Sequence, residues 1–156
     1  MKNKEPYPKP DPPIHKTGKK RDHAYVGALN IFVNKKGEIL LMKRSKQSVV
    51  YPNTWGLVGG YLEMGETGAE GAAREAGEEI GVEVRVDRFT GRYYNTSHPY
   101  HMIVISLPHY STIISGKPHA AQPEECSDVR WFKPSEIRKM ELCYDHKDIL
   151  VDEKLI

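Results

Sequence analysis

Three glutamates with helical spacing are the residues of this chain best suited to chemistry. Glu75, Glu78 and Glu79 occupy positions i, i+3 and i+4, and residues at that spacing share one face of a helix. Three carboxylates on one face are expected to converge near one point. Clustered carboxylate oxygens suit Mg²⁺ or Mn²⁺, and such ions usually also bind substrate phosphates. The spacing therefore indicates a divalent-cation site.

The sequence around these glutamates is not chosen for helix stability alone. Like charges at this spacing destabilise a helix by a few tenths of a kcal/mol per pair. Gly68, Gly71 and Gly77 lie in the same stretch, and each interior glycine costs up to ~1 kcal/mol relative to alanine. A bound cation removes the repulsion between the carboxylates. A solvated helix face is the alternative interpretation when the three glutamates are taken alone.

Charge is distributed unevenly along the chain. Residues 60–82 carry six acids and one base, a local net of −5, although 23 Lys and Arg against 21 Asp and Glu give the whole chain only +2. The remainder, with 22 bases and 15 acids, carries +7. An acidic segment that binds cations, inside a basic surface, suits a polyphosphate ligand.

The wider pattern is far more specific than the three glutamates. Gly60, five residues, Glu66, seven residues and then residues 74–82 match Gly-x5-Glu-x7-Arg-Glu-U-x-Glu-Glu-x-Gly-U. Here U is a bulky or aliphatic residue, and Ala76 is a small occupant of one such position. On this motif the chain resembles the Nudix hydrolases. The resemblance covers about residues 24–140, including a Trp-Gly-Leu-Val-Gly-Gly run before the motif and a later Arg-Trp-Phe run.

The resemblance implies an α/β fold, an α/β/α sandwich with a central mixed sheet that carries a loop–helix–loop motif. It implies hydrolysis, dependent on Mg²⁺ or Mn²⁺, of the diphosphate linkage in a nucleoside diphosphate joined to a group X, such as a nucleoside triphosphate or an ADP-ribose-like compound. By position, Glu75, Glu78 and Glu79 match the metal-binding carboxylates. Gly59 matches a residue whose backbone carbonyl completes the metal shell, and Gly60 is expected at the substrate.

Two further motif residues are predicted to support the catalytic carboxylates. Glu66 and Arg74 match the family's supporting pair, and Arg74 is the one base in the acidic segment. A guanidinium can hold carboxylates in place through paired hydrogen bonds. The alternative for Arg74 is a plain intrahelical ion pair worth ~0.3–0.5 kcal/mol.

The general base is left open by the sequence. A carboxylate within hydrogen-bond reach of a water can accept its proton, and in the family this group is a motif glutamate or a residue on a distant loop. The motif candidates are Glu75 and Glu79, and the loop candidates are Glu124 and Glu125, which are otherwise ordinary loop residues. Weaker candidates are the histidines of the variable region, His98, His101, His109 and His119.

Arg44 is the predicted phosphate-binding residue. It ends a predicted strand and matches a position that contacts phosphate in several relatives. A fork-shaped guanidinium suits phosphate better than an ammonium group does. A solvated strand end is the alternative.

The elements that position these residues follow from local patterns. Residues 24–33 and 38–43 predict two strands joined by a turn, in which Gly37 supplies a positive φ, and hence a hairpin. A helix is predicted over residues 67–80, with Thr67 and Glu70 as a capping box and Gly81 as its stop. Further strands are expected at residues 55–58, 82–87, 89–94, 101–107 and 129–132, and short helices at 134–137 and 145–151.

The length of 156 residues predicts one domain. Residues 1–20 hold five of the eleven prolines and many lysines, which favours an extended, solvated tail. An arm that reaches toward an anionic ligand is the alternative for this tail. The Nudix domain is expected to span residues 21–156.

Composition excludes several classes of protein. No run approaches the roughly 18 apolar residues of a membrane span, and the N-terminus lacks the apolar core of a signal peptide. Cys126 and Cys143 have no CxxC spacing, which favours reduced cysteines and a cytoplasmic location. The pI of 8.4 lies below the value of about 9 typical of nucleic-acid-binding domains. We expect a nucleotide-type small-molecule substrate, no membrane or nucleic-acid partner, and an assembly compatible with a homodimer.

Other functions compete with a hydrolase. The alternative is a Nudix-fold module that binds a nucleotide metabolite as a sensor without turnover, but a binder has no need of all three glutamates. An isomerase of diphosphate substrates is disfavoured because the chain is short and no cysteine lies near the motif. A basic-tailed nucleic-acid binder is disfavoured by the mild pI.

Overall fold

A computed structural model describes residues 24–97 and 103–156 of the chain. The predicted tail, the first two positions of the strand expected at 101–107, and the candidates His98 and His101 lie outside the described residues.

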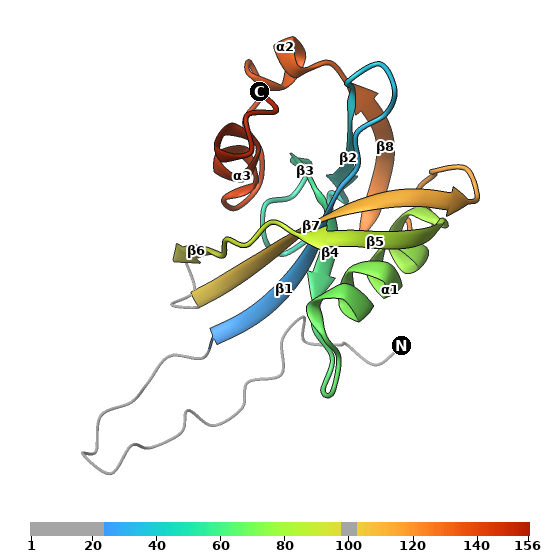
Figure 1. Cartoon of the computed structure of the whole chain (residues 1–156). Coiled ribbons are helices and arrows are strands. Elements are labelled where there is room, and N and C mark those ends of the chain that lie inside the picture. The colour runs from blue at the N-terminus through green and yellow to red at the C-terminus, as the bar shows by residue number, and fades with distance from the viewer. Residues whose placement is uncertain (1–23, 98–102) are drawn as a thin grey trace.

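A mixed sheet of five strands carries the motif (Figure 1). Its strands are β1 (Ala24–Ile31), β4 (Val58–Tyr61), β5 (Glu83–Phe89), β6 (Tyr94–Ser97) and β7 (Ile103–Ser115). The order is β4-β1-β7-β5, and β6 also pairs with β7. β1 runs parallel to β7, with Ala28 opposite Leu107, and the other pairs are antiparallel.

A second sheet of three antiparallel strands lies beside the first. It consists of β2 (Ile39–Arg44), β3 (Trp55–Gly56) and β8 (Cys126–Phe132), in the order β3-β2-β8. The register between β2 and β8 shifts at Lys43 and Arg44, where a bulge places Arg44 opposite Cys126. A bulge bends its strand and redirects a side chain, so the predicted phosphate-binding residue sits at an irregular strand end.

Three helices cover the sheets, α1 (Gly68–Ile80), α2 (Pro134–Ile137) and α3 (His146–Asp152). The predicted capping box of α1 is confirmed, because the Glu70 N–H donates to the Thr67 hydroxyl and the Glu70 carboxylate accepts from the Thr67 N–H. The helix ends at Gly81, whose φ of 67° gives the left-handed conformation of a C-cap. None of the described helices is long and apolar enough to cross a membrane.

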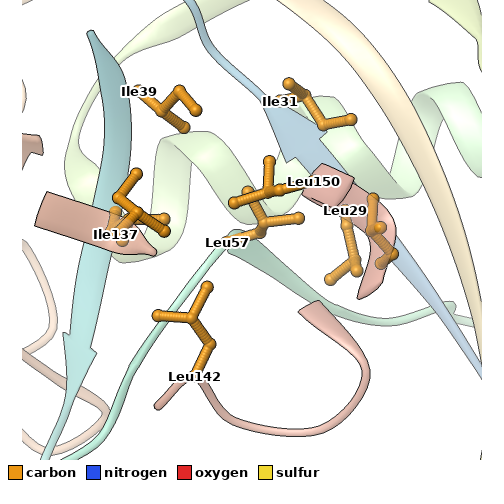
Figure 2. Close-up of a cluster of buried hydrophobic side chains, with 9 residues drawn as sticks. Leu29, Ile31, Ile39, Leu57, Ile137, Leu142 and Leu150 are labelled. Atoms are coloured by element: carbon orange, nitrogen blue, oxygen red, sulfur yellow. The ribbon is translucent and has the colours of Figure 1, made fainter. Parts of the chain in front are cut away.

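The core has two parts, because β1 and β2 alternate the directions of their side chains. Leu29 and Ile31 of β1 pack with Leu41 of β2 and with Ile149 and Leu150 of α3 (Figure 2). The side chains that point the other way, those of Phe32, Leu40 and Met42, pack with residues of α1. α1 and α3 therefore cover different faces of the sheets, which confirms the predicted mixed α/β fold.

The predicted hairpin of residues 24–33 and 38–43 is wrong. The turn exists, since the Gly37 N–H donates to the Asn34 carbonyl at 2.9 Å and Gly37 has a φ of 75°. Beyond one bridge between Val33 and Ile39, however, the strands separate into different sheets. The reason is edge occupancy, because β1 pairs with β4 and β7 and so has no edge left for β2.

Several other strand boundaries differ from the prediction. The strand expected at 55–58 is divided into β3 and β4, which belong to different sheets. The strand expected at 89–94 is displaced to β6, because a turn at Gly91, with a φ of 83°, separates it from β5. β7 continues through Pro108 to Ser115 instead of ending at residue 107. Pro108 is tolerated because pairing with β5 ends at the next residue, His109. β8 begins at Cys126, three residues before the predicted start.

Candidate active site

Two motif glutamates of α1 point inward against β4. Glu75 and Glu79 are buried, with 8% and 4% of their surfaces exposed. The Gly59 N–H donates to Glu79 Oε2 at 2.9 Å. A Cβ at Gly60 would lie 2.5 Å from Glu75 Oε1, and one at Gly59 would overlap the Ala28 carbonyl. Gly60 is therefore required for the Glu75 carboxylate to approach β4, and Gly59 for the close pairing of β4 with β1.

Burial makes these two carboxylates unusual acids. Desolvation raises the pKa of Glu79 well above its ordinary value of 4.5, and the charge of Glu75 raises it further, while the Gly59 N–H opposes the shift. Desolvation also raises the pKa of Glu75, against the hydrogen bond from Arg74. Two adjacent buried carboxylates repel each other, and a positive charge between them favours ionisation of both.

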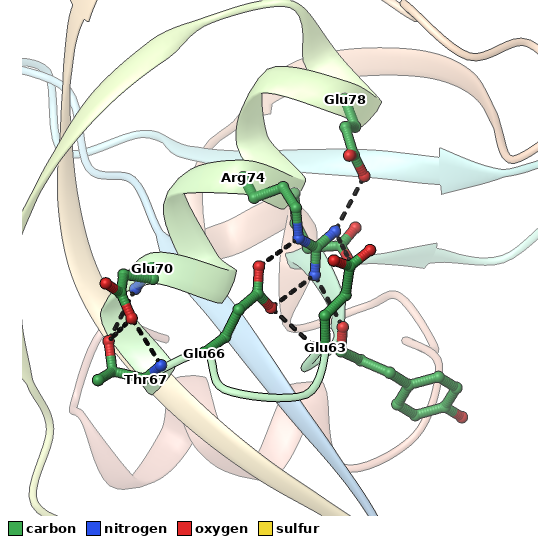
Figure 3. A network of polar contacts seen from close by, with 8 residues as sticks. Glu63, Glu66, Thr67, Glu70, Arg74 and Glu78 are labelled. Atoms are coloured by element: carbon green, nitrogen blue, oxygen red, sulfur yellow. Dashed lines mark hydrogen bonds and ion pairs between the residues drawn. The ribbon is translucent and has the colours of Figure 1, made fainter.

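Arg74 joins the carboxylates to the loop before the helix (Figure 3). Its Nε donates to Glu66 Oε1 at 2.6 Å and its Nη2 to Glu66 Oε2 at 3.1 Å. Its Nη1 donates to Glu75 Oε1 at 2.8 Å and to Glu78 Oε2 at 2.9 Å, and Nη2 also reaches the Tyr61 carbonyl at 2.9 Å. The predicted pairing of Arg74 with Glu66 is thus present, and Arg74 contacts two motif carboxylates as well.

The same contacts determine the protonation states of this group. The hydrogen bonds that Arg74 donates to Glu66 lower the pKa of Glu66 and raise the pKa of Arg74. Glu66 also accepts from the Glu63 N–H at 2.8 Å, which closes the loop against the helix. Glu63 itself is exposed, and Glu70 serves as the cap, as expected for two acids outside the motif.

Convergence of all three motif carboxylates is not what the structure shows. The Glu78 side chain is 46% exposed and turns to Arg74, so Glu75 and Glu79 are the two that face inward. Across residues 24–97 and 103–156, no group of three or more acidic, histidine or cysteine side chains is close enough to form a metal site. The physical reason is that the Arg74 guanidinium bridges Glu75 and Glu78 and holds them around itself.

A cavity of about 730 Å³ opens in front of Glu75 and Glu79. Nearly all residues predicted for the site line it, with the exception of Glu66, which acts on it through Arg74. The predicted residues on its wall are Arg44, Gly59, Gly60, Arg74, Glu75, Glu78, Glu79, Glu124 and Glu125. Such a volume is typical of small-molecule sites.

The two loop candidates for the base are not equivalent. The Glu125 carbonyl accepts from the Ser45 N–H at 2.9 Å, and the Ala121 N–H donates to the Glu79 carbonyl at 3.0 Å, so the loop is tied to both walls of the cavity. The charge of Glu125 contributes to the raised pKa of Glu75 and of Glu79, whereas Glu124 contributes to neither. Glu125 is therefore the loop carboxylate that acts on the buried pair.

Arg44 faces the buried pair from the other wall. Its Nε donates to the Val50 carbonyl at 2.8 Å, and its Cζ lies 5.7 Å from the centroid of the Tyr144 ring. Its charge lowers the pKa of Glu79. Among the residues that the structure describes, no carboxylate lies within ion-pair distance of Arg44, which leaves its charge available to a ligand.

The described histidine candidates lie elsewhere, and a different histidine lines the cavity. His109 packs against Gly68, and His119 packs against Gly81; neither lines the cavity. His146 does, and its Nδ1 accepts from the Leu57 N–H at 3.0 Å. Burial lowers the pKa of His146 to about 3, so its ring is neutral at physiological pH.

Sequence reasoning missed the whole turn that carries His146. Cys143, Tyr144 and Ser106 also line the cavity and were not predicted. The one available signal was the Asp-His pair before the apolar run of the last helix, and that signal has no specificity without the fold.

The site thus combines a mixed sheet, a capped helix with inward carboxylates and a polar cavity of small-molecule size. A sequence model of the NUDIX domain matches residues 22–152. The chain therefore belongs to the Nudix hydrolase family, as its motif predicted.

Relatives and solved structures agree with this assignment. An uncharacterised Nudix hydrolase of Pseudomonas aeruginosa is 32% identical over 124 residues, which cover 76% of this chain and 71% of that protein. A protein of Methanocaldococcus jannaschii named ADP-ribose pyrophosphatase is 29% identical over 125 residues, covering 80% and 70%. The crystal structure of a MutT protein from Methanosarcina mazei superposes with a TM-score of 0.74 at 24% identity, over 88% of this chain and 96% of that one.

Proposed function

We propose that this protein is a Mg²⁺-dependent pyrophosphohydrolase that cleaves the diphosphate linkage of a nucleoside diphosphate joined to a group X. The observation that carries the proposal is the pair Glu75 and Glu79, buried side by side at the wall of a polar cavity, with the pKa of each raised. Buried acids without a compensating cation destabilise a fold. Their presence at a cavity supports a function that requires them.

The residues at this wall fit a divalent ion of the Mg²⁺ type. They offer carboxylate and backbone carbonyl oxygens, which hard cations prefer, and Gly60 leaves space beside Glu75 that a side chain would fill. Glu75, Glu79 and the Gly59 carbonyl would hold the ion, with Glu78 joining once it leaves Arg74. When bound, Mg²⁺ or Mn²⁺ neutralises the diphosphate and lowers the pKa of water.

Three groups of the chain have distinct roles in the proposed reaction. Glu125 accepts the proton of the water that attacks phosphorus, and the bridging oxygen leaves with the second product. Arg44 donates hydrogen bonds to the phosphate oxygens, because its guanidinium faces the cavity without an acidic partner among the described residues. Arg74 and Glu66 orient Glu75 through the hydrogen bonds of Figure 3.

An ADP-ribose-like compound is the substrate class that we place first. The support is the name of the Methanocaldococcus jannaschii relative, which covers 80% of this chain. Nucleoside triphosphates are the second class, since a MutT-like protein of Streptomyces ambofaciens is 31% identical over 129 residues. The two buried thiols Cys126 and Cys143, neither in a disulfide, support the cytoplasmic location that we propose.

A substrate panel tests the proposal directly. The full chain is incubated with ADP-ribose, dinucleoside polyphosphates, nucleotide sugars and nucleoside triphosphates, with Mg²⁺ or with EDTA, in water enriched in ¹⁸O. We expect cleavage of a diphosphate bond with Mg²⁺ alone, and one ¹⁸O in a phosphate product by mass spectrometry. Cleavage that is equally fast in EDTA would overturn the proposed metal dependence.

Two glutamates of the same cavity wall form a matched pair of variants. Glu78→Gln removes a motif carboxylate and is expected to abolish Mg²⁺-dependent turnover. Glu63→Gln removes an exposed carboxylate that lines the cavity outside the motif, and its turnover should match the wild type. Full activity of folded Glu78→Gln, judged by circular dichroism, contradicts the metal assignment.

A further inference from the structure

Unusual backbone conformations gather around Arg44. Among the described residues, four non-glycine positions have a positive φ, and three of them, Tyr51 (49°), Asn53 (58°) and Tyr144 (50°), belong to two segments whose tyrosine rings touch. A non-glycine residue in the left-handed region costs about 1–2 kcal/mol. Such conformations persist where the surroundings fix them and often mark functional positions.

The turn before α3 is fixed on three sides. The Cys143 N–H donates to the Trp55 carbonyl at 2.9 Å, the Leu57 N–H donates to His146 Nδ1 at 3.0 Å, and Ser106 Oγ donates to Asp145 at 3.0 Å. A Cβ on Gly56 would lie 2.7 Å from His146 Nδ1, so the glycine is required for this close packing. The turn therefore holds Tyr144 in its strained conformation.

The Tyr144 ring lies beside the Arg44 guanidinium. Its centroid is 4.7 Å from that of Tyr51 and 5.6 Å from that of His146, and Arg44 Cζ lies 5.7 Å from it. That distance is within the range of a cation–π contact. Apart from this ring, Arg44 is held by one side-chain hydrogen bond, from Nε to the Val50 carbonyl.

We propose that Tyr144 is a positioning residue, which holds the Arg44 guanidinium in the cavity in the orientation that receives a diphosphate. The inference rests on the proposed function in so far as Arg44 binds phosphate. Ordering a long side chain on binding costs free energy, and the ring removes that cost before the ligand arrives. Neutral His146 supports the ring without placing a second positive charge beside Arg44.

The test is a double-mutant cycle on binding. The probe is α,β-methylene-ADP with Mg²⁺, whose diphosphate bond cannot be hydrolysed, and its Kd for the full chain is measured by calorimetry. Tyr144→Asn removes the ring and keeps a residue that tolerates the left-handed region. We expect at least fivefold weaker binding in Tyr144→Asn, weaker binding still in Arg44→Ala, and no further loss in the double variant.

Two more variants separate positioning from packing. Tyr144→Phe keeps the ring and should recover most of the affinity. Tyr110→Asn removes the ring beneath Arg88, whose Cζ lies 4.1 Å from it, outside the cavity, and should leave the Kd unchanged. An arginine Nε–Hε relaxation measurement by NMR, without ligand, should show increased motion of Arg44 in Tyr144→Asn and no change in Tyr110→Asn.

The outcomes distinguish this inference from the proposed function. An unchanged Kd and unchanged Arg44 motion in Tyr144→Asn overturn the inference. A loss of affinity that is equally large in the Arg44→Ala background also overturns it, because the ring then contacts the ligand itself. Wild-type protein that binds α,β-methylene-ADP but hydrolyses nothing overturns the proposed function alone, whereas failure to bind it removes the basis of both.

Discussion

Two arginines reach the cavity from opposite walls, and their surroundings differ completely. Arg74, on α1, donates to three carboxylates and one carbonyl, and its hydrogen bonds to Glu66 raise its pKa further. Arg44, at the end of β2, donates from its side chain to one carbonyl and lies over one aromatic ring. Both are guanidinium groups, but Arg74 has its charge balanced within the fold.

The difference indicates that the two arginines have separate roles, one in the structure of the cavity wall and one toward a ligand. An arginine whose donors already bind carboxylates orders those carboxylates and has little left for a ligand. An arginine with one side-chain hydrogen bond keeps its remaining donors for an anion. Arg74 therefore belongs to the structure of the carboxylate wall, whereas the remaining donors of Arg44 fit the phosphate-binding role that we propose for it. The following variants are ordered from the largest expected effect to the smallest.

The carboxylate wall should be the more sensitive to a single change. Glu79→Gln keeps the shape of a fully buried side chain and removes its charge, and we expect kcat/KM to fall by about 10³-fold. Thermal unfolding should occur at the same temperature or higher, because desolvation disfavours the ionised glutamate. A folded variant with wild-type kcat/KM would show that the buried pair does not serve catalysis.

The loop glutamates sharpen the assignment of the base. Glu125→Gln should lower kcat by about 10²-fold, because Glu125 acts electrostatically on both buried carboxylates. Glu124→Gln is the matched neighbour, and its loss should be much smaller. Steady-state kinetics of both variants, measured side by side with the wild type at neutral pH, decide between them. Equal losses would assign the effect to loop charge in general.

The two arginines themselves can be compared through kcat, KM and stability. Arg44→Ala should raise KM about 10- to 100-fold, as expected for loss of a charged hydrogen bond, with little change in stability. Arg74→Ala leaves Glu66, Glu75 and Glu78 uncompensated and should lower the free energy of unfolding by about 1–3 kcal/mol. Urea unfolding and initial-rate kinetics measure both. A larger loss of unfolding free energy in Arg44→Ala than in Arg74→Ala would contradict these separate roles.

Stability should depend on pH through the carboxylate wall. The folded-state pKa of Glu79 is raised above its ordinary value of 4.5, so its favourable contribution is complete below that value and is lost as pH rises through the raised pKa. Glu75 has the same sign. In EDTA, the free energy of unfolding of the wild type should therefore fall by at least about 1 kcal/mol more than that of Glu79→Gln when the pH is raised from acidic to neutral.

Unfolding in urea at several pH values, with EDTA and with Mg²⁺, checks this expectation. Mg²⁺ should restore the lost stability in wild type and have less effect in Glu79→Gln. Glu66 behaves oppositely, because its pKa is lowered in the folded state. Its contribution to stability is present above its ordinary pKa and is lost as the pH falls below that value, so it affects a more acidic range of pH than Glu79 does. Parallel pH curves for wild type and Glu79→Gln would refute the link between burial of Glu79 and stability.

The helix cap does not line the cavity and should affect stability alone. Thr67→Ala removes the capping hydrogen bond to the Glu70 N–H and should cost about 1 kcal/mol. kcat/KM should stay within twofold, which is roughly the error of such assays, since a cap fixes the helix end rather than the cavity. Thr67→Ser keeps the hydroxyl and serves as the control. A large loss of activity in folded Thr67→Ala would show that the cap also positions the carboxylates.

The local features of the motif could be predicted because their causes are local. The capping box of Thr67 and Glu70 and the stop at Gly81 depend on residues within a few positions of one another. The contact of Arg74 with Glu66 followed from the family motif. The orientation of Glu78 could not be predicted, because the nearby guanidinium competes for its carboxylate.

The pairing of strands could not be predicted from local pattern. β1 and β2 have the alternation and the turn of a hairpin, yet β1 pairs with β4 and β7 from distant parts of the chain. Likewise, the strand expected to end at residue 107 continues through Pro108, because this residue lies just beyond the limit of the β5 pairing. Such outcomes depend on which strand edges remain available in the assembled sheet.

By itself, the sequence determined the family, the capped helix, the shared helical spacing of Glu75, Glu78 and Glu79, and the arginine at the end of β2. Only the tertiary structure decided that the loop of Glu124 and Glu125 lines the same cavity as the buried pair, and that Tyr144 and His146 line it as well. The reason is physical: helix spacing and capping are set by neighbours in sequence, whereas burial, desolvation and ring contacts arise when segments distant in sequence pack together.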